Sequence, residues 1–170
     1  MDFIEYALWL PLLTVAVFDI RDNRIPNNWV ILSLITMVAA LALKYNGLTN
    51  IPASNLIAFF LMLALGFVLF SMRVMAGGDV KLMAVLALGT GLEHLATFLM
   101  ATVLCGAVYG LFYLFSYISR SHLTVKDQAL KYVREQIVLR RHLATRISNK
   151  LRLPFAPAII TGFALYPMWV

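Results

Sequence analysis

Long apolar stretches, separated by short polar segments, run along most of the chain. A helix needs about 20 mostly apolar residues to cross the hydrocarbon core of a bilayer. Six stretches are close to that length and predict an all-α protein with six transmembrane helices. They are Phe3–Phe18, Trp29–Leu43, Ile51–Met72, Val80–Leu92, His94–Ile118 and Phe155–Val170. The fourth is short, so we expect it to cross a thinned bilayer or to begin in a protein-lined cavity.

The composition agrees with a membrane protein. Of the 170 residues, 62% are hydrophobic and 13% are charged, whereas soluble domains are about half apolar and about a quarter charged. The single cysteine, Cys105, allows no internal disulfide and no paired-cysteine metal site. The first residues lack the basic region of a cleavable signal peptide, so we expect a retained first helix. The chain is predicted to be one integral-membrane domain over residues 1–170.

The basic residues predict an orientation. If six helices cross the membrane, the loops on one side hold every lysine and arginine except Lys44. Cytoplasmic loops of membrane proteins carry an excess of such residues. Both termini are therefore expected outside, and the three basic loops are expected in the cytoplasm.

Residues 119–152 form the one long polar stretch. Thr124 and Asp127 have the spacing of a helix-capping box, and apolar residues recur after them at helical spacing. We expect a basic amphipathic helix lying on the anionic inner leaflet, or a surface that docks a partner. The stretch has no aromatic-interleaved basic motif, so no nucleic-acid partner is expected.

Two acids stand at the cytoplasmic ends of different predicted helices: Asp19 in AVFDIRDNRIPN and Asp79 in AGGDVK. Either acid alone could be an interfacial residue or a helix cap. Two carboxylates on separate elements can also share a proton, one activating water while the other protonates a peptide carbonyl. The pair therefore indicates aspartic-protease chemistry. Asp22, between Arg21 and Arg24, is expected to stay solvated and paired.

The residues beside Asp79 suggest how a peptide reaches it. Gly77 and Gly78 can adopt positive φ, so we expect them to turn the backbone tightly and leave space for a peptide, although a plain loop would also use glycine. Lys81 could orient Asp79, contact a lipid phosphate, or mark the cytoplasmic boundary. The sequence has no HExxH, GxSxG, P-loop or GxGxxG motif, and its histidines are scattered, so no metal and no cofactor are expected.

These residues resemble the type IV prepilin peptidases, the GxGD class of polytopic aspartic proteases. Asp19 is followed by Ile25-Pro26-Asn27 as D-x5-I-P-N, AGGDVK follows the third predicted helix, and LPFAPAII at 153–160 resembles the family's late P-F-x-P segment. The short form of the chain is similar to the peptidases of Tad/Flp-type pilus systems. Ala76 departs from the first glycine of the GxGD pattern.

The resemblance implies that Asp19 and Asp79 are the catalytic pair. We expect Gly77, Gly78, Lys81 and the Ile25-Pro26-Asn27 segment to shape the loops and the substrate site around them. The resemblance also implies a bacterial inner-membrane enzyme that cuts the short basic leader from prepilins at the cytoplasmic face, just before their apolar helix. The cysteine pairs that accompany N-methylation in longer members are absent from this sequence, so methyltransferase activity is not carried over.

Two other functions fit the sequence. The acids could relay protons or bind cations in a small transporter or channel subunit, which predicts acids near the midplane and broken helices. A non-catalytic pilus-assembly subunit would tolerate loss of either aspartate. Small residues such as Gly66, Gly106 and Gly110 could pack against a substrate helix, or simply against helices of this chain.

Overall fold

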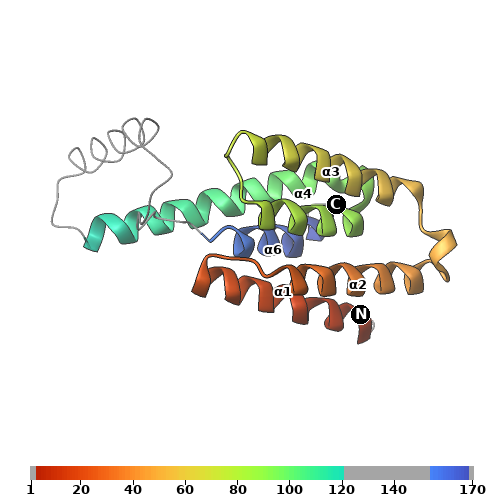
Figure 1. The fold of residues 1–170 in the computed structure, drawn as a ribbon. Helices are drawn as coiled ribbons and strands as arrows, with labels where there is room; N and C mark the ends of the chain where they lie inside the picture. Colours follow the sequence, from red (N-terminus) through yellow and green to blue (C-terminus); the bar gives the residue numbers. More distant parts are fainter. Residues whose placement is uncertain (1–2, 121–153, 169–170) are drawn as a thin grey trace. The chain divides into compact units, whose positions relative to one another are not determined.

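A computed structural model describes residues 3–120 and 154–168 of the chain, and all of its regular structure is helical (Figure 1). The elements are α1 (Phe3–Asp22), α2 (Asn27–Lys44), the 3-10 turn η1 (Leu48–Asn50), α3 (Ala53–Ser71), α4 (Gly77–Arg120), α6 (Ala156–Leu165) and the 3-10 turn η2 (Tyr166–Met168). The all-α prediction is confirmed. The predicted amphipathic stretch at 119–152 lies outside the described residues, apart from its first two.

Three helices in the described part of the chain are long and apolar enough to cross a membrane. They are α2, α3 and residues Gly77–Ser116 of α4. The described helix α6 is also apolar but has only 10 residues. Large apolar side chains on the outer faces of these helices are exposed, including Ile35, Phe60 and Phe67. An outward apolar surface of this kind suits contact with lipid, and the membrane character predicted from composition is supported.

The chain divides into two compact units, Met1–Ala107 with Pro154–Val170, and Val108–Leu153. The first unit holds the hydrophobic core. Within it, α1 packs along α2 and also against α6 (Figure 1). Trp9 of α1 and Phe98 of α4 both contact Phe163 of α6, with ring centroids 6.1 Å apart in each pair. The late segment of the chain is therefore built into the core beside the earliest one.

Gly91 divides α4 into two helical segments, residues 77–90 and 92–120. Its φ of 73° and ψ of 172° are not helical, and only glycine adopts such a conformation without strain. Asn55 of α3 is buried there and donates its side-chain N–H to the carbonyl of Leu88 at 2.7 Å. The break that the sequence predicted between residues 92 and 94 thus lies at Gly91.

The two segments of α4 run in opposite directions in the first unit. Residue 78, at the start of the first segment, packs on Ile25 just after α1, and residue 106 in the second packs on Phe155 just before α6. Those two places are linked, because Asp19 near the end of α1 hydrogen-bonds Ala156. Residues 78 and 106 therefore lie toward the same end of the bundle, and the chain reverses between them.

Small residues allow close packing inside the first unit. A Cβ atom on Gly66 would lie 2.5 Å from Val80, and one on Gly162 would lie 2.7 Å from the Cα of Thr102. A Cβ on Gly106 would lie 3.0 Å from the ring of Phe155, whereas one on Gly110 would meet nothing within 4 Å. Gly66 and Gly106 therefore pack against other parts of this chain, which is the simpler of the two predictions made for them.

Candidate functional site

Asp19 is a buried acid that caps a helix other than its own. It lies in the last turn of α1 with 6% of its surface exposed. Its Oδ2 atom accepts a 2.8 Å hydrogen bond from the backbone N–H of Ala156, the first residue of α6. The first N–H groups of a helix have no partner within the helix and carry a partial positive charge. This contact stabilises the carboxylate in an otherwise apolar setting.

Asp79 is the second buried acid and comes from another helix. It is the third residue of α4, and 8% of its surface is exposed. The residue before it, Gly78, packs on Ile25 just after the end of α1, so Asp79 lies at the end of the bundle where Asp19 also lies. The structure thus brings together the two acids that the sequence singled out, 60 residues apart in the chain. Two acids in one poorly solvated place do not both ionise easily, which favours a shared proton.

Gly77 and Gly78 do not form the predicted tight turn. They are the first two residues of α4, and neither has a positive φ. The left-handed residue between α3 and α4 is Arg73, with a φ of 59°. The prediction of a glycine turn is therefore wrong. The helix already starts at Gly77, and the turn falls earlier, at Arg73, a residue type that gives no turn signal in a sequence.

Gly78 instead allows a close approach between two chain segments. A Cβ atom at this position would lie 2.9 Å from the Cβ of Ile25, a separation that real side chains do not adopt without backbone movement. Ile25 comes from the D-x5-I-P-N stretch, and Gly78 comes from AGGDVK. The absence of a side chain at residue 78 lets these two motifs pack directly on each other.

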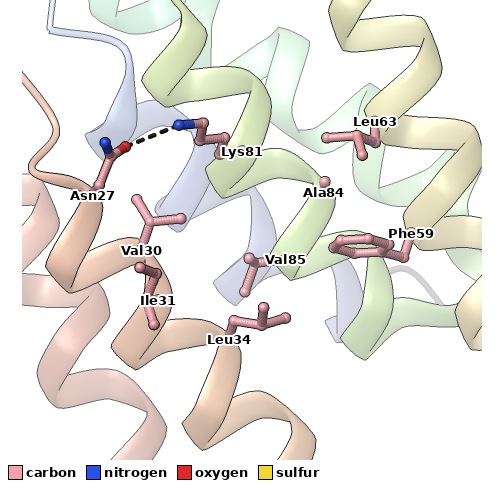
Figure 2. A pocket seen from close by; sticks show the side chains of 9 residues that line it. All are labelled: Asn27, Val30, Ile31, Leu34, Phe59, Leu63, Lys81, Ala84 and Val85. Carbon is pink, nitrogen blue, oxygen red and sulfur yellow. Dashed lines mark hydrogen bonds between the residues drawn. The ribbon is translucent and has the colours of Figure 1, made fainter.

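Pro26 and Asn27 begin α2, and Asn27 makes a second link between the motifs. Pro26 precedes the helix with extended backbone angles, and its carbonyl accepts the N–H of Trp29 at 3.2 Å. Lys81 of α4 donates from Nζ to Oδ1 of Asn27 at 3.0 Å, as Figure 2 shows. Lys81 and Asp79 both lie in the described part of the chain, and they form no ion pair with each other. Lys81 therefore ties α4 to α2 and does not contact the acid directly.

The neighbouring charged residues are solvated. Asp22 is exposed and lies 3.7 Å from Nε of Arg21, which confirms the prediction that Asp22 stays solvated and paired. Arg24 and Arg73 are exposed as well. Within residues 3–120 and 154–168, no cluster of three or more histidine, cysteine or acidic side chains could hold a metal ion.

The part that sequence reasoning missed is the contact of Asp19 with the start of α6. Residue-level patterns pointed to Asp19, and the resemblance pointed to the Pro154–Pro157 segment, but nothing joined the two. A backbone N–H is the donor, and a backbone donor leaves no side-chain signature in a sequence. The proline at the second position of α6 was the available hint, because proline is favoured in the first turn of a helix.

The comparisons with known proteins give a family for the chain. A sequence model described as the type IV leader peptidase family matches residues 6–111, a range that includes both acids, the Ile25-Pro26-Asn27 segment and AGGDVK. No curated protein and no solved structure gave a match.

Proposed function

Because the chain belongs to the type IV leader peptidase family, we propose that it is a membrane aspartic endopeptidase that removes the short basic leader of pilin-like precursors. The family supports a leader peptidase activity, and the Flp/Tad-type pilin precursor is our specific proposal for the substrate. The observation that carries the proposal is the burial of two carboxyl groups from different helices, Asp19 and Asp79, at the end of the bundle where Gly78 packs on Ile25. Hydrolysis of a peptide without a metal or a covalent nucleophile needs such a pair.

The surroundings of the two acids suggest separate roles. A hydrogen bond from a backbone N–H favours the ionised form of a carboxylate, and Asp19 accepts such a bond from Ala156. We assign Asp19 as the general base that takes a proton from the attacking water. Asp79 then donates its proton to the oxygen of the scissile carbonyl, which gives a neutral tetrahedral intermediate. Collapse of that intermediate returns the proton to Asp79, while Asp19 passes its proton to the departing amine, so both carboxyl groups regain their starting states.

The proposed location of the reaction is the cytoplasmic rim of the bacterial inner membrane. Four basic residues near the two acids are exposed, namely Arg21, Arg24, Arg73 and Lys81. Basic residues at the ends of membrane helices mark the cytoplasmic side. Six spans, with both termini outside, would place these residues and both acids there, where a short basic leader is still accessible.

Conversion of each acid to its amide tests the dyad. The protein is reconstituted in liposomes with a pilin-like precursor, and the appearance of the shortened product is followed over time. Asp19→Asn and Asp79→Asn are each expected to lower the rate by about a hundredfold or more, since each removes one proton-transfer group. Asp22→Asn is the matched control, because this nearby acid is exposed and paired with Arg21. A normal rate in either dyad variant would overturn the proposal.

A further inference from the structure

An apolar groove lies between α2, α3 and the first segment of α4, with a volume of about 340 Å³. Its walls are hydrocarbon except at Asn27 and Lys81 (Figure 2). The lining residues are Asn27, Val30, Ile31, Leu34, Phe59, Leu63, Lys81, Ala84 and Val85. An apolar groove on the outside of a membrane protein is filled by apolar groups from its surroundings, because water would find almost no hydrogen-bond partners there.

The polar end of the groove lies at the depth of the acid pair. Lys81 and Asn27 are hydrogen-bonded to each other at this end. Asp79 comes two residues before Lys81 in the same helix, and a helix rises about 1.5 Å per residue, so the two side chains start only about 3 Å apart along the axis of α4. An apolar helix seated in the groove would therefore have its polar end level with the acids.

The groove and Asp79 lie on different faces of α4. Lys81, Ala84 and Val85 follow helical spacing and share one face, whereas two residues of a helix that are two apart point to nearly opposite sides. A peptide that joins the groove to Asp79 must pass around the start of α4, a width of about 10 Å. About three extended residues cover that distance.

We propose that this groove binds the first turns of the substrate's own apolar helix, the segment directly after the cleaved bond. The inference rests on the proposed leader peptidase function, in which the substrate is a short basic leader followed by an apolar helix. That substrate needs an apolar docking surface whose polar end matches the depth of the acids, and the groove has this property because Lys81 at its polar end is only two residues from Asp79 in α4. A lipid acyl chain would also fit the walls, but its position would have no relation to the acids.

Filling the groove tests the inference. Ile31 lines the groove and is 55% exposed, whereas Ile35, one turn later on α2, is 58% exposed and is not part of the lining. Ile31→Trp is expected to lower kcat/KM on the full precursor by about tenfold, a common effect of a misfitting hydrophobic pocket. The same variant should cut a soluble leader peptide that lacks the apolar helix at the wild-type rate. Ile35→Trp should cut both substrates normally.

The two substrates separate the two proposals. If the wild-type protein cuts neither the precursor nor the short peptide, the leader peptidase function itself is wrong. If the wild-type protein cuts both, and Ile31→Trp also cuts both at the wild-type rate, the groove is not the docking site although the function stands.

Photo-crosslinking tests the same groove without adding bulk. Phe59 lines the groove, while its sequence neighbour Phe60 is 63% exposed and lies outside it. Each is replaced in turn by the photoreactive phenylalanine analogue p-benzoylphenylalanine, in an Asp79→Asn background that holds the substrate uncut. The residue-59 probe is expected to link to the apolar helix of the precursor several times more than the residue-60 probe. Equal linking at both positions, or linking of residue 59 to phospholipid alone, would overturn the inference.

Discussion

Asp19 shows, at the scale of a single residue, how an acid is accommodated in an apolar bundle. Its carboxylate takes up an N–H of α6 that has no partner within that helix. The cost of burying the acid is offset by satisfying a helix end, and the start of α6 is fixed against α1 by the same bond. The contact has a chemical consequence as well, because it favours the ionised form of Asp19, which is the form that can take a proton from water.

The two roles predict that cleavage has a bell-shaped dependence on pH. At low pH Asp19 is protonated and cannot accept a proton from water, and at high pH Asp79 has lost the proton that it must donate. The measurement is kcat/KM for the short leader peptide over a range of pH, with the fold monitored in parallel. Asp22→Asn should leave both limbs of the profile unchanged. A flat profile from about pH 5 to 8 would contradict a proton-sharing pair.

The hydrogen bond between Lys81 and Asn27 gives a second prediction at this scale. It ties the beginning of α4 to the start of α2, and we expect it to help hold Asp79 in position relative to Asp19. Lys81→Met and Asn27→Leu should each lower kcat for the short peptide by about threefold to tenfold, the range expected for one net hydrogen bond of about 0.5–1.5 kcal/mol.

A variant that carries both substitutions shows whether the two residues act through their shared hydrogen bond or independently of each other. If the bond is what matters, Lys81→Met combined with Asn27→Leu should lower kcat no further than either single change, because both remove the same interaction. Losses that multiply in the double variant would contradict the positioning role. The short peptide is the substrate of choice, since it does not reach the apolar groove that both residues also line.

Single residues were predictable where their chemistry is unusual for their surroundings. Asp19 and Asp79 stood out because an acid beside an apolar run needs a reason. The role of Gly78 was not predictable in detail, because glycine permits both a left-handed turn and a close approach, and only the position of Ile25 decides between them. The role of Lys81 was left open for the same reason, since its partner Asn27 is 54 residues away.

Helix α6 packs closely on the second segment of α4. Gly162 faces the backbone of Thr102, and a Cβ atom would lie 2.7 Å from its Cα. Gly162→Ala is expected to lower the stability of the detergent-solubilised protein by about 1–3 kcal/mol, the usual cost of an overpacked core. Because the start of α6 donates to Asp19, the cleavage rate should fall as well. Gly110→Ala is the control, since a Cβ there meets nothing within 4 Å.

The measurement is a thermal unfolding assay with the rate of cleavage recorded on the same samples. A Gly162→Ala protein with wild-type stability and activity would contradict the close packing of α4 on α6. A large loss of stability in Gly110→Ala would show that the effect belongs to glycine in a helix and not to this contact.

The helices themselves were largely predictable from apolar runs, but their ends and pairings were not. The predicted stretches Trp29–Leu43 and Ile51–Met72 correspond to α2 and α3 within two residues at each end. The predicted fourth stretch began at Val80, whereas α4 begins at Gly77. Gly77, Gly78 and Asp79 are not apolar, so a search for apolar runs does not include them although they are helical. The contact between α1 and α6 joins distant parts of the chain, and an apolar run alone does not reveal which other run it packs on.

At the scale of the whole molecule, composition identified the class and the resemblance identified the family, which the match over residues 6–111 confirms. The orientation is a further prediction, and it rests on an asymmetry of charge rather than on any contact. This asymmetry sets the orientation when the chain is inserted into the membrane, and the contacts between the folded helices do not depend on it.

The orientation can be measured at the two ends of α2. Arg24 precedes this helix and Thr49 follows it, and both residues are exposed. The 18 residues of α2 span about 27 Å, close to the thickness of a hydrocarbon core. With Cys105 replaced by serine, Arg24→Cys and Thr49→Cys are made separately and treated with a maleimide that does not cross membranes. In right-side-out spheroplasts Thr49→Cys should be labelled and Arg24→Cys protected, and in inverted vesicles the pattern should reverse. Labelling of Arg24→Cys in spheroplasts would place the acids on the outer face and remove the basis for cleavage in the cytoplasm.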